Sequence, residues 1–426
     1  SVSVSFNKSS KQGNELDYIH HTISHGQVAG DQTFSKKCQS LLEDTLGVQK
    51  ALITSSCTHA LEMAAILLNI QPNDEVIIPA FTFVSTANAF VLHGARPIFC
   101  DIRPDTLNLD ESKLESLITK KTRAIVVVNY AGVGCEMDTI LDIANRHGIA
   151  VVEDNAHGLF GKYQGHSLGS FGSLATLSFH ETKNITCGEG GALLINNEKF
   201  IERAEIIREK GTNRARFFRG QVDKYSWVDL GSSYVMSDIL AAFLYGQLEK
   251  WQEIQKKRKK IWKRYNEELS DWAEQNGVRQ PVVPEHCDQA YHMYYLLMPS
   301  TECRSEFIAQ LKDRGVMAVF HYLPLNASNF ALRMVEKGWQ KFQCPITEDV
   351  SKRIVRLPFY ADLSEDDRCQ LRNHFIGFVF QFFHLLPDLN VLENVMLPTV
   401  ISQETGEWNR NRSKLESRGE GLLERV

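Results

Sequence analysis

A lysine beside a glycine-rich run and an acidic residue at the end of a hydrophobic run are the two positions of this sequence best suited to catalysis. Lys183 precedes the run 188–191, and Asp154 follows the hydrophobic segment 149–153. A lysine amine forms a Schiff base with the aldehyde of pyridoxal phosphate (PLP), and a carboxylate keeps the pyridine nitrogen protonated so that the ring accepts electrons. Each residue alone is ordinarily a solvated loop lysine or a helix cap. Together they predict a PLP site, provided that a phosphate-binding element accompanies them.

A candidate phosphate-binding element lies earlier in the chain. We expect a strand at 51–54, a turn of small residues at 55–58 and a helix at 59–68. A helix that begins after such a turn directs free N–H groups and the positive end of its dipole toward an anion. Ser56 or Thr58 could instead act only as the N-cap of this helix, and the two functions are compatible.

Length, charge and cysteine usage are those of a soluble enzyme. The 426 residues are enough for two domains, and the net charge of −5 indicates neither a nucleic-acid partner nor a membrane surface. The nine cysteines form no CxxC pair, which favours reduced thiols in a cytoplasmic protein. Cys57 and Cys187 lie in the predicted site and are expected to fill space. No signal-like segment begins the sequence, and the longest apolar run, 375–386, is too short to cross a membrane.

Strands and helices are predicted to alternate through the first half of the chain. Continuous Val/Ile runs separated by amphipathic helices are typical of a mostly parallel sheet covered on both faces. The predicted strands are 75–79, 96–101, 123–129, 149–153 and 192–196. Ligands of such sheets bind beyond the carboxyl ends of the strands, where Asp154, the turn 55–58 and Phe81 all fall.

A smaller α/β unit is expected after a long helix at 237–265 that is broken or bent. Its predicted elements are a strand at 291–298, a helix at 304–314 and a strand at 316–322. We therefore predict an α/β protein with a large domain at 1–245, a small C-terminal domain at 246–373 and an atypical tail at 374–426.

Four motifs together resemble the DegT/DnrJ/EryC1/StrS aminotransferases, which are fold-type I PLP enzymes acting on nucleotide-linked keto sugars. The motifs are Thr54-Ser-Ser-Cys-Thr-His-Ala-Leu61, Pro79-Ala-Phe-Thr-Phe-Val84, Val152-Glu-Asp-Asn-Ala-His157 and Ser178-Phe-His-Glu-Thr-Lys-Asn184. The resemblance covers residues 5–372 and implies a large, mostly parallel sheet domain with a smaller α/β domain. It also implies a homodimer with its active sites at the subunit interface.

The resemblance implies a role for each residue around the cofactor ring. Lys183 would hold PLP and then carry the proton between the amino donor and the cofactor. Asp154 would pair with the ring nitrogen, Phe81 would stack on the ring, and His157 would lie near the ring hydroxyl.

The same resemblance implies that Ser178 and the N–H groups of Cys57 and Thr58 hold the phosphate, while Ser233 serves the partner subunit's cofactor. The chain departs from the family pattern at three positions. Cys57 stands where glycine is common, Ser233 where many members have asparagine, and Asn326 where histidine is common. Because Asn326 replaces that histidine, the family's contact between the histidine and the sugar is not expected in the same form here.

Three further segments, 30–31, 132–138 and 207–213, resemble the family members that aminate C4 of a dTDP-linked keto sugar with L-glutamate as the donor. The resemblance implies conversion of dTDP-4-keto-6-deoxyglucose to dTDP-4-amino-4,6-dideoxygalactose for the enterobacterial common antigen, a cell-surface polysaccharide. The alternatives are amination at C3, or a PLP- or PMP-dependent sugar dehydratase of the same fold. Dehydratases of this kind carry histidine at the Schiff-base position, so Lys183 disfavours them.

The tail resembles a different class of protein. The segment 375–398 is similar to the Q-loop stretch of ABC-transporter ATPases, with Gln381 as its glutamine. The sequence contains no GxxxxGK[ST] phosphate loop, so an ABC-type nucleotide-binding function is not expected. We expect a fusion or frameshift origin for this tail, or else an ordinary amphipathic extension.

Overall fold

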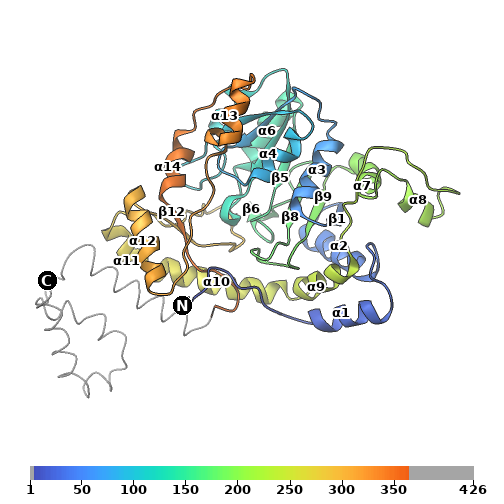
Figure 1. Ribbon diagram of the computed structural model, residues 1–426, viewed down its shortest axis with the longest axis horizontal. Helices are drawn as coiled ribbons and strands as arrows, with labels where there is room; N and C mark the ends of the chain where they lie inside the picture. Colours follow the sequence, from blue (N-terminus) through green and yellow to red (C-terminus); the bar gives the residue numbers. More distant parts are fainter. Residues whose placement is uncertain (1–3, 364–426) are drawn as a thin grey trace, which may run out of the picture.

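The computed structural model describes residues 4–363, and a seven-stranded sheet forms its centre (Figure 1). Its strands are β1 Lys50–Thr54, β2 Glu75–Pro79, β3 Arg96–Cys100, β4 Thr122–Val128, β5 Ala150–Asp154, β8 Leu174–Ser178 and β9 Gly191–Ile195. Their order across the sheet is β1-β9-β8-β5-β4-β2-β3. Strand β9 is antiparallel to β1 and β8, and the pairings from β8 to β5, β4, β2 and β3 are parallel. The predicted mostly parallel α/β sheet is confirmed.

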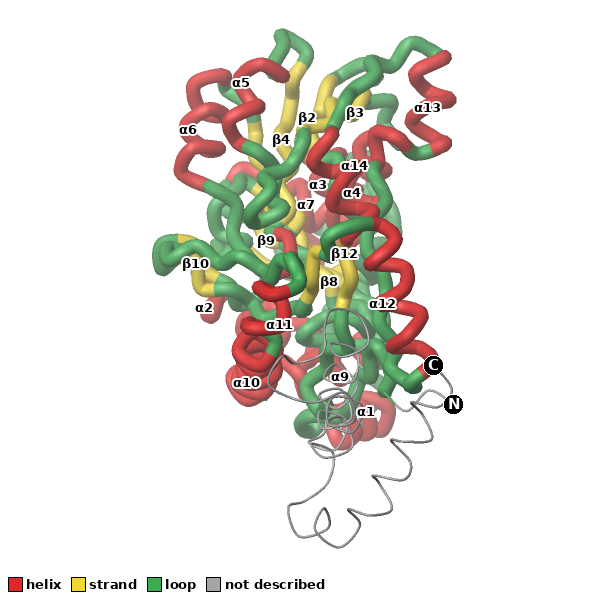
Figure 2. The backbone as a smooth tube through the Cα atoms, turned by 90° about the vertical axis from the view of Figure 1, so that its left-hand side faces the viewer, coloured by secondary structure: helices red, strands yellow, loops and turns green. Residues whose placement is uncertain are grey.

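Helices cover both faces of the sheet, which explains why its strands are continuous apolar runs. The helices on one face are α3 Cys57–Leu67, α4 Val84–Val91 and α7 Ile201–Arg208. Those on the other face are α2 Thr33–Leu46, α5 Leu114–Leu117, α6 Met137–His147 and α9 Asp238–Leu248. Figure 2 shows the sheet between α5 and α6 on one side and α3 and α4 on the other.

Two helices illustrate how the sequence sets their ends and buried faces. Helix α3 starts after the N-cap Ser56. It buries its Ala, Leu and Met side chains in an apolar cluster on one face of the sheet. Helix α6 buries Met137, Ile140 and Ile143, which recur at helical spacing, and it ends at Gly148. Gly148 has φ 64°, a left-handed conformation that glycine adopts without steric cost.

A second packing unit lies beside the sheet. Strands β11 Tyr295–Leu297 and β12 Ile354–Arg356 form an antiparallel pair, covered by α10 Trp251–Glu268, α11 Ser270–Gln275 and α12 Thr301–Asp313. Its buried cluster is separate from those on the large sheet and includes Val4, whose N–H donates to Gly315 O over 3.0 Å. Val4 therefore packs on the small unit, whereas Tyr18 and Ile19 pack on the large one.

The remaining elements are short or peripheral. They are α1 Glu15–Ser24, α8 Arg214–Phe218, α13 Asn329–Glu336, α14 Pro345–Arg353, β6 Lys162–Tyr163, β7 His166–Ser167 and β10 Cys287–Asp288. None of the helices in residues 4–363 is long and apolar enough to cross a membrane. The predicted tail at 374–426, with the ABC-like segment 375–398 and Gln381, lies outside the described residues.

One sequence prediction about elements is confirmed, one needs correction, and one strand was missed. The helix predicted at 237–265 as broken or bent is broken into α9 and α10, which are separated between residues 248 and 251. The strand predicted at 316–322 makes only isolated bridges, Val4 with Val316 and Val319 with Arg356, because short segments rather than a full strand lie beside it. Strand β8 was not predicted, since its sequence Leu-Ala-Thr-Leu-Ser lacks a run of β-branched residues.

Candidate active site

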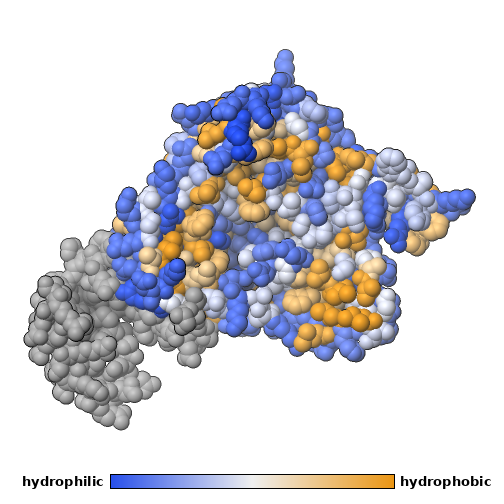
Figure 3. Space-filling view, viewed as in Figure 1, coloured by the Kyte–Doolittle hydropathy of each residue, from blue (hydrophilic) through white to orange (hydrophobic). Residues whose placement is uncertain are grey.

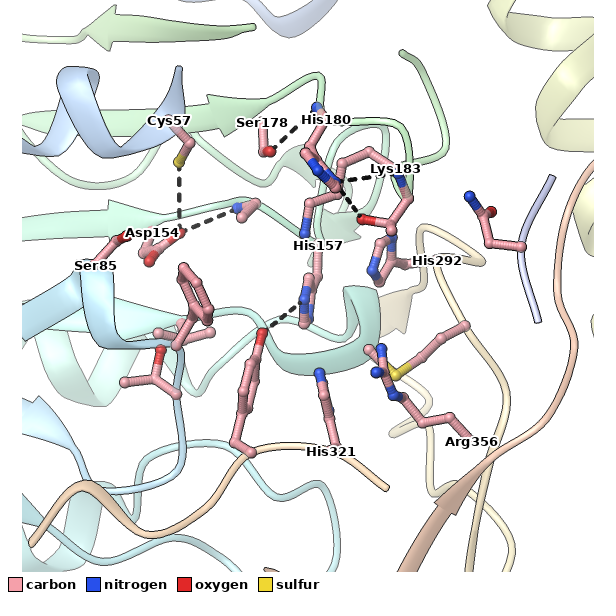
Figure 4. Close-up of a pocket in the computed structure, with 18 of the residues that line it drawn as sticks. Cys57, Ser85, Asp154, His157, Ser178, His180, Lys183, His292, His321 and Arg356 are labelled. Carbon is pink, nitrogen blue, oxygen red and sulfur yellow. Dashed lines mark hydrogen bonds between the residues drawn. The ribbon is translucent and has the colours of Figure 1, made fainter. Parts of the chain in front are cut away.

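A cavity of about 700 Å³ opens at the carboxyl end of β5, beside the second packing unit. Its walls come from distant parts of the chain: the start of α3, the end of β5, the loop between β8 and β9, and the end of β12. Figure 4 shows Asp154 and Cys57 on one side of this pocket and His292 and Arg356 on the other. The volume is in the range of pockets that enclose a cofactor or a small substrate.

Asp154 is the last residue of β5, and its carboxylate lines the cavity. Thr86 on α4 donates its hydroxyl proton to Asp154 Oδ2 over 2.6 Å, and the N–H of Ala156 donates to Oδ1 over 3.3 Å. Burial raises the pKa of Asp154, while the Thr86 hydrogen bond and the charge of Lys183 act in the opposite direction. A cationic group beside this buried carboxylate would therefore stabilise its ionised form.

The neighbouring carboxylate of Glu153 supports the fold. Successive side chains of a strand point to opposite faces, so Glu153 faces away from the cavity. Its two oxygens accept backbone N–H bonds from Gly169, Phe171 and Gly172 at 2.8, 2.9 and 2.8 Å. These bonds hold the chain that leads into β8.

Lys183 lies on the loop 179–190 between β8 and β9. The loop is closed at its base, where Phe179 N–H donates to Gly190 O over 2.7 Å. The side chain of Lys183 reaches into the pocket (Figure 4). Burial lowers the pKa of Lys183, and the charge of Asp154 partly offsets this effect. A lysine with a lowered pKa keeps a neutral amine nearer to neutral pH, as a nucleophile or general base requires.

The turn before α3 has the features of an anion site. Ser56 caps the helix, its hydroxyl accepting an N–H from the first turn over 3.0 Å. The hydroxyls of Thr58 and Ser85 share a hydrogen bond of 2.8 Å at the cavity wall. A Cβ at Gly191 would lie 2.3 Å from the N atom of Cys57, so this close approach requires glycine. The first N–H groups of α3 have no partner within the helix, and the helix dipole adds positive potential here.

Cys57 and Ser178 complete this end of the cavity. Cys57 Sγ lies 3.4 Å from Thr176 Oγ1 and 4.0 Å from Asp154 Oδ1. Burial raises the pKa of the Cys57 thiol, which keeps it protonated and poorly nucleophilic. Ser178 ends β8, and its hydroxyl accepts the N–H of His180 over 3.4 Å.

His157 lines the cavity as a buried, neutral ring. Its Nδ1 accepts the N–H of Ala131 over 3.2 Å, so Nε2 carries the proton and lies 3.1 Å from the Tyr322 hydroxyl. The ring stacks on His292 with centroids 4.2 Å apart. Burial lowers the pKa of His157 well below its ordinary value. The residue can therefore offer a hydrogen bond to a ligand without carrying a charge.

Phe81 does not line the cavity, which corrects the prediction that it stacks on a cofactor ring. It is 1% exposed, and its ring packs against Tyr130 and Tyr322 with centroids 5.0 and 5.5 Å away. Phe83 lines the cavity instead and is 56% exposed. The chain bends at 80–82 before α4, so Phe81 turns into the core while Phe83 stays at the surface of the pocket.

Two residues at which the chain departs from the family pattern lie outside this cavity. Ser233 is exposed and pairs with Glu209 through an isolated bridge, so it does not reach the pocket of its own chain. Asn326 is buried, and its Nδ2 donates to Phe342 O over 3.2 Å and to Glu348 Oε1 over 3.0 Å. Asn326 therefore supports the fold and makes no contact in the cavity.

The structure adds cavity residues that sequence analysis did not single out. Among them are Asn7, His292, His321, Tyr322 and Arg356. His321 Nδ1 lies 2.6 Å from the Tyr130 hydroxyl, and Asn7 Nδ2 donates to Glu181 O over 3.0 Å on the lysine loop. The available signal was the clustering of histidine with aromatic residues in two short runs, 291–295 and 320–322.

Residues 10–374 match the sequence profile of the DegT/DnrJ/EryC1/StrS aminotransferase family. An uncharacterised protein of Methanocaldococcus jannaschii is 36% identical over 360 residues, which cover 83% of this chain and 92% of that protein. The spore coat polysaccharide biosynthesis protein SpsC of Bacillus subtilis is 32% identical over 363 residues, covering 83% of this chain and 91% of SpsC.

Solved structures of similar sequence share the fold. The aminotransferase TlmJ of Streptoalloteichus hindustanus superimposes with a TM-score of 0.79 at 26% identity, covering 87% of this chain and 97% of TlmJ. A DegT DnrJ EryC1 StrS aminotransferase of Brucella abortus gives a TM-score of 0.76 at 28% identity, with coverages of 86% and 95%. The fold is therefore that of the fold-type I PLP aminotransferases.

Proposed function

Because this chain belongs to the DegT/DnrJ/EryC1/StrS aminotransferases, a PLP-dependent family, we propose that its cavity transfers an amino group to a nucleotide-linked keto sugar. The observation that carries the proposal is the convergence of Lys183, Asp154 and the N-terminus of α3 on one cavity. These three features provide an amine, a carboxylate and an anion site. PLP carries an aldehyde, a ring nitrogen and a phosphate, which match them one to one.

The chemistry of the cavity fits PLP group by group. The buried carboxyl of Asp154 gains a counter-charge from a protonated ring nitrogen. The open N–H groups at Cys57 and Thr58, with the hydroxyls of Ser85 and Ser178, would hold the phosphate. In this proposal Phe83 lies against the ring face, and His157 exchanges its Nε2 bond with Tyr322 for one to the ring hydroxyl.

Lys183 would act first as the attachment point and then as the general base. PLP supplies an aldehyde that accepts the amino group and a ring that withdraws electrons from the reacting carbon. The lowered pKa of Lys183 lets its neutral Nζ remove a proton from the carbon that bears the amino group. The same amine can then return the proton to the neighbouring carbon.

The finer substrate assignment rests on the resemblance of single segments. We propose L-glutamate as the donor and dTDP-4-keto-6-deoxyglucose as the acceptor, aminated at C4, as in dTDP-4-amino-4,6-dideoxygalactose transaminase. Segments 30–31, 132–138 and 207–213 support this choice. The name of the relative SpsC supports a place in polysaccharide synthesis, and the enterobacterial common antigen is our specific proposal.

We also propose a homodimer in which Ser233 serves the partner's phosphate site. Large apolar side chains are exposed near this residue, with Trp227 82% and Phe218 69% exposed. Leu16 and Ile23 on α1 are 62% and 56% exposed, and apolar side chains gather over the same part of the molecule in Figure 3. Exposed apolar patches of this kind favour contact with a second copy.

The experiment that tests the proposal is an amination assay with purified protein, PLP, L-glutamate and dTDP-4-keto-6-deoxyglucose. We expect a glutamate-dependent amino sugar by mass spectrometry, with nitrogen at C4 by NMR and no product from Lys183→Ala. Nitrogen at C3 would show that the enzyme is a transaminase that aminates C3 rather than C4. A deoxygenated sugar without incorporated nitrogen would instead favour the dehydratase.

A further inference from the structure

Arg356 is a cation in the cavity wall that lacks an anionic partner. It ends β12, and its backbone is held between Tyr295 and Val319. Its Nε donates to Phe320 O over 3.2 Å, and its guanidinium carbon lies 4.8 Å from the centre of the Phe6 ring. Within residues 4–363, no carboxylate lies within ion-pair distance of Arg356, and its two terminal nitrogens make no hydrogen bond.

Arg356 is half-buried, with its guanidinium at the wall of the cavity. Burying a guanidinium without a counter-charge is unfavourable, and burial accordingly lowers the pKa of Arg356. Arg353, three residues earlier, shows the usual arrangement: it pairs with Asp349 at 2.7 Å and donates to Met298 O over 2.8 Å. Arg356 instead directs its fork of donors into the pocket, toward His292 (Figure 4).

A second polar group on the same wall also lacks a partner. His292 is 5% exposed, and its Nδ1 is buried with no hydrogen bond among the described residues. Its ring stacks on His157, which fixes its orientation. Buried polar atoms are nearly always paired, so the unpaired Nδ1 of His292 indicates that a ligand completes it. The guanidinium of Arg356 lines the same cavity and offers a cation to that ligand.

The position of these groups decides which anion they receive. The phosphate of PLP belongs at the start of α3, on the opposite side of the pocket from Arg356 (Figure 4). The remaining anions are the carboxylate of an amino donor and the diphosphate of a nucleotide sugar. A donor's α-carboxylate is bonded to the reacting carbon, so it must lie near Lys183. The diphosphate is separated from C4 of the sugar by the whole ring.

We propose that Arg356 and His292 form the subsite for the α-carboxylate of the amino-acid donor. The guanidinium fork binds the two carboxylate oxygens, and His292 donates a further hydrogen bond from its ring. This subsite would select an amino acid over other amines and would release the product as a 2-keto acid. The inference rests on the proposed aminotransferase function.

The test separates the two half-reactions in single turnovers of the PLP-loaded enzyme. Arg356→Gln should lower kcat/KM for glutamate by about a hundredfold and leave the reverse half-reaction with the amino sugar within about threefold. Arg353→Gln removes a nearby cation outside the pocket and should leave both half-reactions unchanged. Calorimetric titration of glutarate should show the same loss of affinity in Arg356→Gln, with unchanged PLP content.

His292→Asn provides a second, independent test if Arg356→Gln does not fold. It should weaken the glutamate half-reaction by about tenfold and spare the sugar half-reaction. A variant that loses the sugar half-reaction and keeps glutamate would overturn the inference and assign the subsite to the diphosphate. If the unaltered enzyme itself fails to react with any amino acid, the proposed function fails rather than this subsite.

Discussion

Thr86 donates its hydroxyl proton to Oδ2 of Asp154 over 2.6 Å, which joins the first turns of α4 to the end of β5. The bond fixes the orientation of the carboxylate and favours its ionised form against the effect of burial. A residue from a different helix therefore tunes the acid on which the proposed cofactor binding depends.

Replacing Thr86 should weaken the cofactor site without unfolding the chain. Thr86→Val keeps the shape of the side chain but removes a hydrogen bond to a charged group, a change of about 1.5–3 kcal/mol. We expect the Kd for PLP, measured by absorbance titration, to rise about tenfold. Thr176→Val is the control, because Thr176 is the strand neighbour of Asp154 but its hydroxyl bonds to Cys57 and not to the carboxylate. Equal PLP affinity in the two variants would show that Thr86 does not support the carboxylate.

Asp154 and Glu153 are adjacent carboxylates with different roles, and the amide variants should separate them. Asp154→Asn should reduce transamination by at least about a hundredfold with little change in Tm, because an amide does not keep the ring nitrogen protonated. Glu153→Gln should leave PLP binding intact but lower the free energy of unfolding by about 1–3 kcal/mol, since an amide presents N–H groups to backbone donors. Activity assays and urea unfolding on both proteins check this, and near-normal rates in Asp154→Asn would contradict the assignment.

Phe83 and Phe81 should show opposite effects on binding and stability. Phe83→Ala removes the exposed ring in the cavity, so the Kd for PLP should rise about fivefold to tenfold while Tm changes little. Phe81→Ala leaves a hole in the core and should cost about 3–5 kcal/mol of unfolding free energy. Tm and PLP titration measured on the same samples distinguish the two. A larger loss of PLP affinity in a folded Phe81→Ala protein would restore the original assignment to Phe81.

Three buried histidines should make the stability of the PLP-free protein depend on pH. Burial lowers the pKa of His157, His292 and His321 well below the ordinary value, so they are neutral in the folded chain. The unfolded chain binds more protons below about pH 6.5, so the free energy of unfolding should decrease as the pH falls from about 7 to about 5.

Urea unfolding across this pH range measures the effect. In His321→Asn the dependence on pH should be shallower than in the unaltered protein, by up to about one proton. An unchanged dependence in that variant would contradict a neutral, buried His321.

The central residues of the site could be predicted because each belongs to a local pattern. Lys183 precedes a glycine-rich run, and Asp154 follows a hydrophobic run that forms a buried strand. The strands of a parallel sheet end at the same edge, so the sequence was sufficient to place Asp154 beside the turn 55–58. The place of Lys183 depends on β8, which the sequence pattern did not reveal. The sequence could not show that Phe83 rather than Phe81 lines the cavity, because the bend at 80–82 leaves no trace in the hydrophobic pattern.

The far wall of the cavity could not be predicted for a different reason. His292 and Arg356 lie on short segments of the second unit, and only tertiary packing brings them to the pocket. The unpaired state of Arg356 is likewise a property of its surroundings. A sequence shows the charge but not the distance to the nearest carboxylate.

The absorption spectrum of the purified protein with PLP, before and after addition of L-glutamate, tests the central claim most directly. We expect a visible band that requires Lys183, is absent from Lys183→Ala and disappears when glutamate is added. Circular dichroism of Lys183→Ala should match the unaltered protein, which separates loss of attachment from loss of fold. The same visible band in a folded Lys183→Ala protein, or no band in the unaltered one, would contradict the assignment of Lys183 as the residue that holds PLP.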